Sequence, residues 1–330
     1  MNNPKKDFTA LKNKTAIERD SRSNKNIQET HLNEAIEQFL YALEIEGRAD
    51  KTIEQYNYVF RKFKGFLEEN FLISAISPNM IRQFLHDLKK KDLSKATVAI
   101  HYRVLRSFFN WLVGEELLET SPITNINEPK TPKKYPRILN QQQVDKLLQA
   151  AENNSNSWAG QRNYTITTCF LDMGLRLNEL ISANIKDLSF EERTLKVHGK
   201  GAKERVVYFG FQTYKLLKKW TKIRDNKNKP KDQTIFISQT GEKMKSRYVE
   251  HIISDLQKEA GLEDVKVSPH VLRHTAATLA VKNGMETFAL KRFFGWESVR
   301  TAMKYVHLDG SAVKESFSKA SPIDNLNREE

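Results

Sequence analysis

Cysteine is nearly absent from this chain of 330 residues, and Cys169 is its only example. A single cysteine excludes an internal disulfide and a zinc site built on thiolates. Because Thr168 and Phe170 flank it, we expect a buried core thiol. No apolar run is long enough to span a bilayer, and the N-terminus has no signal-peptide pattern. We therefore expect a soluble protein of the cytoplasm.

Acidic residues are also in deficit. The chain has 41 Asp and Glu against 54 Lys and Arg, which gives a formal net charge of +13. A basic excess of this size indicates a polyanionic partner, most simply nucleic acid. Charge alone leaves an ordinary basic protein as the alternative, because net charge reports on partners and not on fold.

The order of polar and periodic segments predicts five parts. Residues 1–30 are too poor in apolar side chains to fold alone, so we expect a basic tail without fixed structure. Residues 31–119 have a helical period, and the proline-bearing residues 120–137 are typical of a semi-extended linker. We expect a second domain in residues 138–310 and a tail or short helix in residues 311–330.

Four amphipathic helices are predicted between residues 31 and 119. The first covers about residues 32–43. The others are predicted to begin near Thr52, at Ser77 and at Ser94, which are residue types that suit helix N-termini. Four helices with short connections predict a small bundle.

The second domain is predicted to be mainly helical with a small antiparallel sheet. Asn140 and Asn178 suit helix caps, and Gly174 suits the end of a helix that begins near residue 165. Alternating side chains predict two strands, at residues 194–198 and 205–209, and residues 234–238 are expected to add a third. Further helices are expected at about residues 211–224, 245–260, 269–282, 286–294 and 298–304.

The stretch that begins at Ser268 carries the clearest chemical signal. Ser268 suits an N-cap and Pro269 the first helical position, so His270 and Arg273 lie on one face near a helix N-terminus. The free N–H groups of such a terminus favour a phosphate. His270 and His274 also have the spacing of a zinc protease, but the residue after His270 is not the Glu which that motif needs.

Five blocks in order resemble the tyrosine recombinases, the phage integrase and Xer class of DNA strand-exchange enzymes. They are GLRLNEL with Arg176, HGKGAKERVVYF with Lys200, PHVLRHTAAT with His270 and Arg273, FFGWES with Trp296, and finally Tyr305. The resemblance implies a mainly α fold, with an N-terminal four-helix, SAM-like core-binding domain. It also implies a mostly helical C-terminal catalytic domain with a small antiparallel sheet.

The resemblance implies site-specific cleavage and rejoining of DNA without a metal, ATP or another cofactor. Tyr305 is then the nucleophile, which attacks the scissile phosphate to give a 3′-phosphotyrosyl link and a free 5′-hydroxyl. Arg176 and Arg273 clamp the non-bridging oxygens, because a guanidinium fork matches phosphate geometry and stabilises the charge that develops there.

The remaining catalytic roles are implied in the same way. Lys200 protonates the leaving 5′-oxygen, with Lys203 as its rival, and His270 exchanges the tyrosine proton. Trp296 replaces the histidine that most members have. Its indole donates a hydrogen bond but cannot shuttle protons, so we expect positioning there, and the replacement favours a mobile element. Glu179 is either an ordinary ion-pair partner of the first arginine or the residue that holds it in place.

Contacts with DNA are expected from the polar side of the fourth helix. On helix statistics alone this side is a solvated face, and the resemblance implies DNA contacts there, above all for Lys95 and Arg106. The candidates are Lys95, Thr97, Arg103 and Arg106, with Lys203 in the second domain and His101 on the same polar side.

The expected partner is double-stranded DNA, in the nucleoid. The resemblance further implies a homo-tetramer on synapsed DNA, linked through the C-terminal segment, and a monomer or weak associate when free. The short N-terminal tail favours the simpler recombinase type, without a separate arm-binding domain. Two alternatives stay open: a nicking and closing enzyme similar to type IB topoisomerases, and a DNA-binding regulator that keeps the fold without cleavage.

Overall fold

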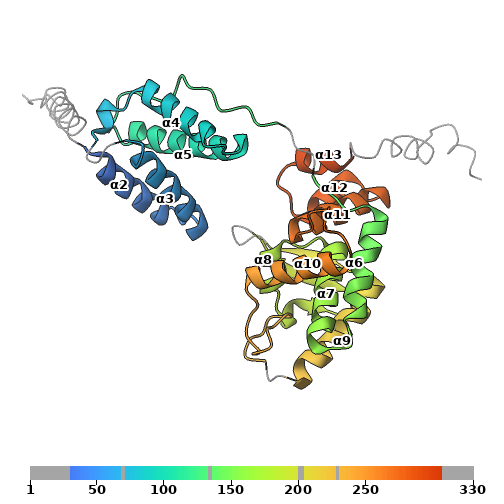
Figure 1. The fold of residues 1–330 in the computed structure, drawn as a ribbon. Coiled ribbons are helices and arrows are strands. Elements are labelled where there is room, and N and C mark those ends of the chain that lie inside the picture. Colours follow the sequence, from blue (N-terminus) through green and yellow to red (C-terminus); the bar gives the residue numbers. More distant parts are fainter. Residues whose placement is uncertain (1–29, 68–70, 133–135, 200–203, 228–229, 307–330) are drawn as a thin grey trace, which may run out of the picture. The chain divides into compact units, whose positions relative to one another are not determined.

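A computed structural model describes residues 30–67, 71–132, 136–199, 204–227 and 230–306. The chain separates into two compact units, Met1–Lys133 and Lys134–Glu330, which are both shown in Figure 1. Each unit has a hydrophobic core of its own. Both are mainly helical, which confirms the predicted fold class.

In its described residues, the N-terminal unit is built from four helices. They are α2 (Leu32–Ile45), α3 (Asp50–Lys64), α4 (Pro78–Lys90) and α5 (Lys95–Gly114), with a short 3-10 turn, η1 (Ile73–Ala75). Phe39, Phe60 and Phe108 meet in the core with ring centroids between 5.1 and 5.9 Å apart. Such buried edge-to-face rings contribute beyond the apolar area that they bury. The predicted four-helix bundle is confirmed.

Two of the predicted helix starts in this unit are confirmed and one is wrong. The side chain of Ser77 accepts the backbone N–H of Met80 at 3.3 Å, and that of Ser94 accepts the N–H of Thr97 at 3.1 Å. The cap predicted at Thr52 is wrong, because α3 begins at Asp50 after the N-cap Ala49. The carboxylate in the first turn of α3 favours this start through the helix dipole, and Thr52 lies within that turn.

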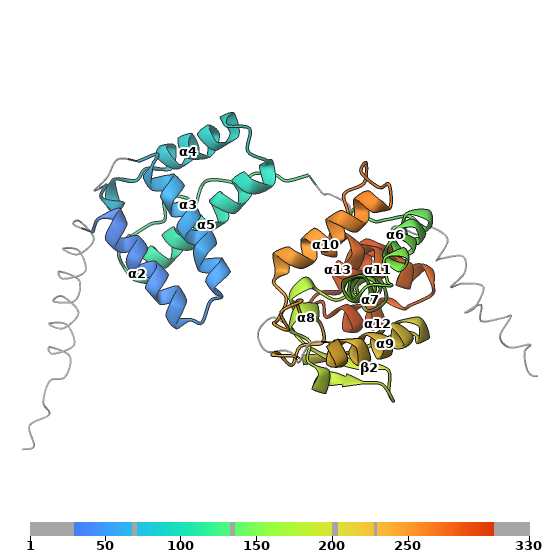
Figure 2. The ribbon, with the colours of Figure 1, turned by 60° about the horizontal axis from the view of Figure 1, so that its bottom comes forward.

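The C-terminal unit is built around α7. Its helices in the described residues are α6 (Gln141–Asn153), α7 (Trp158–Met173), α8 (Leu177–Ser182), α9 (Phe211–Lys227), α10 (Ser246–Glu259), α11 (Pro269–Lys282), α12 (Thr287–Phe294) and α13 (Val299–Val306), with the 3-10 turn η2 (Ile185–Asp187). Helices α6, α9 and α11 each pack on α7, which lies in the middle of the unit in Figure 2. Cys169 on α7 is fully buried, as predicted.

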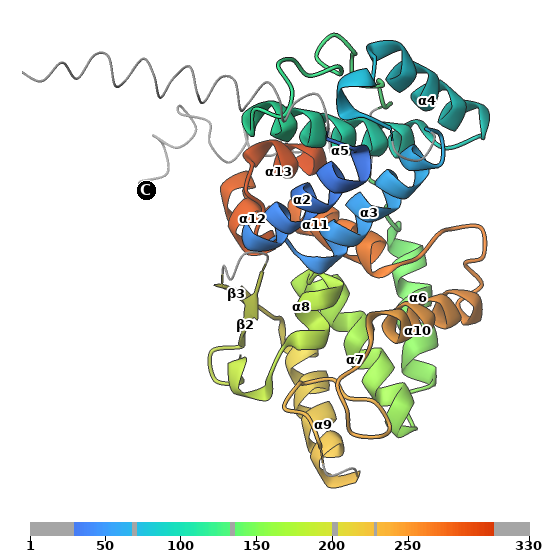
Figure 3. The same cartoon turned by 90° about the vertical axis from the view of Figure 1, so that its left-hand side faces the viewer.

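A three-stranded antiparallel sheet lies at the edge of this unit. Its strands are β1 (Leu188–Ser189), β2 (Thr194–His198) and β3 (Glu204–Tyr208), in the order β1-β2-β3. Leu195 pairs with Val207 and both are buried, whereas the next pair, Lys196 and Val206, is exposed. Strand β3 contacts α12, and Figure 3 shows the β2–β3 hairpin next to that helix.

The third strand predicted at residues 234–238 is wrong. Thr234 makes only an isolated bridge to Asn184, and the third strand of the sheet is β1. All four residues from Thr234 to Ile237 are buried, so the segment does not alternate. The side chains of Trp220 and Arg224 donate to its carbonyls at 2.9 and 3.0 Å, which removes acceptors that a neighbouring strand needs.

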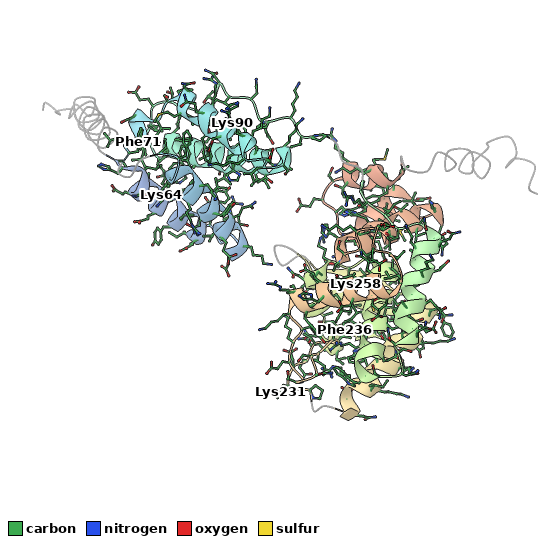
Figure 4. The ribbon with its side chains drawn as sticks, in the orientation of Figure 1. Lys64, Phe71, Lys90, Lys231, Phe236 and Lys258 are labelled. Atoms are coloured by element: carbon green, nitrogen blue, oxygen red, sulfur yellow. The ribbon has the colours of Figure 1, made fainter. Side chains whose placement is uncertain are left out.

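Residues 234–237 are instead buried in the hydrophobic core of this unit. Figure 4 shows Phe236 in the interior, whereas the labelled Lys231 and Lys258 are exposed at the surface. The carbonyls of this segment accept from side chains of α7 and α9, and the N–H of Ile235 donates to the carbonyl of Ala183 at 2.7 Å, so its backbone is satisfied without a continuous ladder. It therefore packs as core without being part of the sheet.

Two helix starts in this unit also differ from the prediction. Helix α7 begins at Trp158 rather than near residue 165, because Ser157 caps it through the N–H of Gly160 at 2.9 Å. Helix α8 begins after Arg176, so the cap predicted at Asn178 is wrong. The carboxylate of Glu179 accepts the N–H of Arg176 at 2.7 Å and stands in for a capping side chain.

Candidate active site

A pocket of about 400 Å³ gathers most of the predicted catalytic residues. Its walls come from the start of α8, the first turns of α11, and the α12–α13 segment. The residues that line it are Pro136, Arg176, His270, Arg273, His274, Trp296, Thr301, Lys304 and Tyr305. Five of the six predicted catalytic residues therefore share one cavity, although they are up to 129 positions apart in the chain.

Arg176 lies at the mouth of this pocket. Its position as N-cap of α8 follows from the end of α7 at Gly174, whose left-handed φ of 56° turns the chain sharply. Its guanidinium donates to Glu179 at 2.9 Å and to the carbonyl of Gly295 at 3.1 Å. The side chain stays 39% exposed, so its outer face is open to a ligand.

Arg273 lies deeper, with only 5% of its side chain exposed. Its two terminal nitrogens donate to the carbonyls of Gly174 and Phe294, each at 2.5 Å. Burial, and then the charge of Arg176, lower the pKa of Arg273 to about 9. The guanidinium therefore keeps its charge at neutral pH, and the backbone fixes its direction.

Glu179 is the buried anion of this site. Its side chain is 3% exposed and lies between Arg176, Arg205 and Arg273. Burial alone raises the pKa of a carboxyl. The hydrogen bonds and charge of Arg205, and then the hydrogen bonds of Arg176, outweigh burial and lower the pKa of Glu179 to about 2. The expectation that Glu179 holds Arg176 agrees with this geometry, and the carboxylate also contacts Arg205 and Arg273.

Arg205 is a functional-site residue that the sequence analysis missed. It donates to both oxygens of Glu179, at 2.6 and 2.8 Å, and to the carbonyl of Phe293 at 2.9 Å. It thereby ties β3 to the anion at α8 and to the end of α12. A signal existed, because Arg205 is two residues from the buried Val207 and so faces inward from its strand.

Tyr305 lies on the buried face of α13, one turn after Ala302. Its ring stacks on Trp296 with centroids 5.0 Å apart and planes 2° from parallel. Trp296 in turn stacks on Phe294 at 5.0 Å. The expected positioning role of Trp296 agrees with this stack, which fixes the plane of the tyrosine ring.

The hydroxyl of Tyr305 lies 2.5 Å from Nδ1 of His274. In the sequence, His274 is notable only for its zinc-like spacing from His270, and no motif predicted it as a site residue. Burial raises the pKa of Tyr305 to about 12 against the opposing charge of Arg273. Burial, and then the charges of His270, Arg273 and Lys304, lower the pKa of His274 to about 4. Both groups are therefore neutral at physiological pH.

His270 occupies the first turn of α11, as predicted. Ser268 caps that helix by accepting the N–H of Val271 at 3.3 Å, with Pro269 in its first position. The His270 ring is exposed and lies 5.5 Å from the ring of His274, centroid to centroid. His270 thus faces the open side of the pocket, and His274 the tyrosine.

Lys200 and Lys203 lie outside the described residues. The described ends of the hairpin, Gly199 and Glu204, line a second cavity of about 940 Å³ together with Arg176 and Trp296. The segment that carries both lysines therefore starts and ends beside the arginine pocket.

The candidates for DNA contacts on α5 are three exposed basic residues and Thr97, which lies in the first turn of the helix. Lys95, Arg103 and Arg106 are exposed and fall within about 80° of one another around the helix. Arg103 pairs with Glu128 at 3.2 Å. The hydroxyl of Thr97 lies 2.8 Å from that of Ser94 at the helix start.

The placement of His101 on the polar side of α5 is wrong. His101 is 1% exposed and its Nδ1 lies 2.9 Å from the carbonyl of Thr97. Its ring packs against Phe84 and Tyr58 with centroids 6.0 Å away in each case. Histidine is polar in sequence patterns, but here it packs as an aromatic core residue.

Two further findings concern all the described residues and not only the pocket. No cluster of three or more His, Cys, Asp and Glu side chains suited to a metal ion occurs among them. In the same described part of the chain, no helix is long and apolar enough to cross a membrane.

Comparison with known proteins identifies the family. Residues 137–311 match the phage integrase family and residues 36–116 match the phage integrase N-terminal SAM-like domain. The tyrosine recombinase XerC of Leptospira interrogans is 32% identical over 88% of this chain and 94% of its own. The tyrosine recombinase XerD of Oceanobacillus iheyensis is 30% identical over 88% of this chain and 99% of its own.

A solved structure agrees with these matches. The XerH site-specific recombinase bound to palindromic difH, in a post-cleavage complex, superposes with a TM-score of 0.68 at 26% identity. The superposition covers 81% of this chain and 79% of that one. The resemblance drawn from five short blocks is thus confirmed over both units, and the chain belongs to the phage integrase family of tyrosine recombinases.

Proposed function

We propose that the protein is a site-specific DNA recombinase that cleaves and rejoins DNA through a 3′-phosphotyrosyl intermediate. The observation that carries the proposal is the convergence of Arg176, Arg273 and Tyr305 on one pocket. A phosphate in that pocket meets two guanidinium groups and the hydroxyl that attacks it. The names of the relatives and the family match support the same activity.

The two arginines supply the charge stabilisation. Arg273 is held by two backbone carbonyls and Arg176 by Glu179, so little reorganisation is needed when the phosphate arrives. Preorganised donors of this kind stabilise the charge that develops in the transition state. Because Arg176 stays partly exposed and Arg273 is buried, they contact the phosphate from the mouth and from the base of the pocket.

The tyrosine requires help to react. With a pKa of about 12, ionising Tyr305 at pH 7 costs about 7 kcal/mol. A proton acceptor and the two guanidinium groups reduce this cost at the moment of attack. Lys200 protonates the leaving 5′-oxygen, and His270, on the open side of the pocket, contacts the phosphate. Religation is the reverse reaction with a new 5′-hydroxyl, so the ester itself conserves the energy of the broken bond.

Both units take part in binding. Residues 31–119 form the core-binding domain, with Lys95 and Arg106 contacting the DNA backbone, and residues 138–310 form the catalytic domain. Residues 120–137 link them. Residues 1–30 and 311–330 form the two tails, and the C-terminal one connects four protomers on synapsed DNA. The DNA-bound structure of XerH supports a DNA partner, and the protein acts in the cytoplasm at the nucleoid.

A nicked suicide duplex tests this proposal. The duplex is selected from a randomised pool by its covalent retention on the wild-type protein, and its nick lets the short 5′-hydroxyl fragment diffuse away. We expect an adduct that survives denaturant, forms in EDTA and leaves a 5′-hydroxyl which a polynucleotide kinase labels directly. A 5′-phosphate on the released fragment, or no retained duplex at all, contradicts the proposal.

A further inference from the structure

Among the described residues, the histidine whose ring nitrogen contacts the hydroxyl of Tyr305 is His274 and not His270. Nδ1 of His274 lies 2.5 Å from the hydroxyl of Tyr305, whereas the His270 ring lies on the exposed side, 5.5 Å from that of His274. His274 follows Arg273 directly on α11. One turn of α11 therefore presents a phosphate-binding arginine and a tyrosine-binding histidine to the same pocket.

We propose that His274 is a further catalytic residue, whose Nδ1 accepts the proton of Tyr305 as the tyrosine oxygen attacks phosphorus. This inference rests on the proposed function and assigns its proton acceptor. In the step, the bond from Tyr305 Oη to phosphorus forms and the bond from phosphorus to the 5′-oxygen breaks. The tyrosine proton moves to His274, and the leaving oxygen receives a proton from Lys200, so charge and protons balance.

The packing of the tyrosine supports this assignment. The stack on Trp296 holds the ring within 2° of the indole plane, and α13 buries the ring against α11 and α12. Rotation of the ring in its own plane is restricted, so the hydroxyl stays at Nδ1. A general base must lie within hydrogen-bond reach of the proton that it takes, and His274 meets this condition before DNA is present.

The charges around His274 explain when it accepts the proton. His270 and Arg273 face it from α11, and Lys304 and Tyr305 from α13. The cationic neighbours and burial keep His274 neutral, so its lone pair is available. Before DNA binds, the proton stays on the tyrosine. A phosphate between the arginines adds negative charge next to the ring, which favours the protonated histidine.

Substitutions at position 274 separate orientation from proton transfer. The amide oxygen of Asn occupies nearly the place of Nδ1 and accepts a hydrogen bond, but it does not take up a proton. His274→Asn therefore keeps the hydrogen bond and loses the base, and His274→Ala loses both. His31→Asn is the matched control, because His31 is exposed at the N-cap of α2 in the other unit.

Single-turnover cleavage of the selected nicked duplex is measured for each variant, together with its affinity for that duplex and its thermal unfolding. We expect both position-274 variants to bind normally and to cleave at least about 100-fold more slowly, with His31→Asn at the wild-type rate. Added imidazole restores part of the rate of His274→Ala. A sulfur in place of the bridging 5′-oxygen, which needs no protonation to leave, does not restore it. Cleavage by His274→Asn within about threefold of wild type contradicts the proposal.

A DNA-free measurement keeps the inference separate from the proposed function. In protein with ¹⁵N-labelled histidine, we expect His274 to carry its proton on Nε2 at pH 7, because Nδ1 accepts from Tyr305. The signal is assigned by its loss in His274→Asn and its shift in Tyr305→Phe. A proton on Nδ1 overturns the inference whatever the protein does to DNA. A failure of wild type to cleave any duplex, with Nε2 protonated, overturns the recombinase proposal and leaves the hydrogen bond from Tyr305 to Nδ1 of His274 in place.

Discussion

At the scale of single residues, Glu179 is the centre of the cluster of charged side chains in the site. One buried carboxylate contacts three guanidinium groups. Removing one member of a buried ion pair leaves its partners without compensation, which typically costs about 3–5 kcal/mol. The arginine clamp therefore depends on an anion that does not itself touch the phosphate in the proposed reaction.

Substitution of Glu179 by Ala tests this dependence. We expect the free energy of unfolding of the C-terminal unit to fall by about 3–5 kcal/mol, as measured by urea denaturation. Glu191→Ala is the control, because Glu191 is exposed in the turn between β1 and β2, and its substitution should change stability by less than about 0.5 kcal/mol. Equal effects of the two substitutions contradict the account.

His274 gives the site an acid-sensitive contribution to stability. Its pKa falls from an ordinary 6.5 to about 4 on folding. Between these values the unfolded chain binds a proton that the folded chain does not. The contribution is therefore complete above about pH 6.5 and is lost as the pH falls toward 4. Glu179, whose pKa falls from 4.5 to about 2, acts in the same direction at lower pH.

Urea unfolding at pH 7 and pH 5 measures this contribution. The full pKa shift of His274 corresponds to about 3 kcal/mol, and partial exposure of the ring reduces it. We expect wild type to lose about 1 kcal/mol more than His274→Asn between the two pH values. An identical loss in both proteins shows that the folded environment of His274 does not depress its pKa.

At the scale of elements, the junction of α7 and α8 sets the position of the clamp. Gly174 ends α7 with a φ of 56°, and its carbonyl accepts from Arg273. A Cβ on Gly174 meets the ring of Phe294 at 2.2 Å. The turn, the buried arginine and the aromatic stack thus share one point where only glycine fits.

Gly174→Ala tests this junction. A left-handed alanine costs about 1–2 kcal/mol, and the collision with Phe294 adds to it, so we expect a loss of about 2–4 kcal/mol. Gly261→Ala is the matched control, because Gly261 has a φ of 63° and nothing within 4 Å of an added Cβ. Its loss should stay at about 1–2 kcal/mol. If thermal unfolding gives the two variants the same loss, the close approach to Phe294 does not constrain the site.

Local chemistry predicted most elements, and the exceptions have physical causes. Ser268 and Pro269 predict the start of α11 because capping needs only neighbouring residues. The strand predicted at residues 234–238 failed because Trp220 and Arg224 take its carbonyls, and their positions depend on how α9 packs.

In the candidate site too, local sequence predicted the residues of short motifs but not those that act through long-range contacts. The motifs located Arg176, Arg273 and Tyr305, since each lies in a short characteristic block. Arg205 and His274 act through contacts across 26 and 31 positions of the chain, and no local pattern specifies such distances. Arg205 had one usable signal, its inward place on β3, whereas His274 became recognisable only when α13 was placed against α11.

At the scale of the whole molecule, the net charge of +13 predicts that DNA binding depends strongly on salt. Each phosphate contact releases counterions, so the logarithm of the binding constant falls linearly with that of the salt concentration. We expect Lys95→Ala and Arg106→Ala each to make this slope shallower by about 1 on any duplex. Fluorescence anisotropy at several salt concentrations measures it, and slopes equal to that of wild type place both side chains away from the backbone of DNA.

The most direct test of the central claim is the identity of the residue that carries the DNA. Trypsin cuts after Lys304 and after Lys314, and the peptide between them contains Tyr305 as its only tyrosine. After reaction with the nicked duplex and nuclease digestion, mass spectrometry of this peptide should show a nucleotide attached through phosphate to Tyr305. Tyr305→Phe should give no adduct at all. A nucleotide found on another peptide, or an adduct that persists in Tyr305→Phe, contradicts the account.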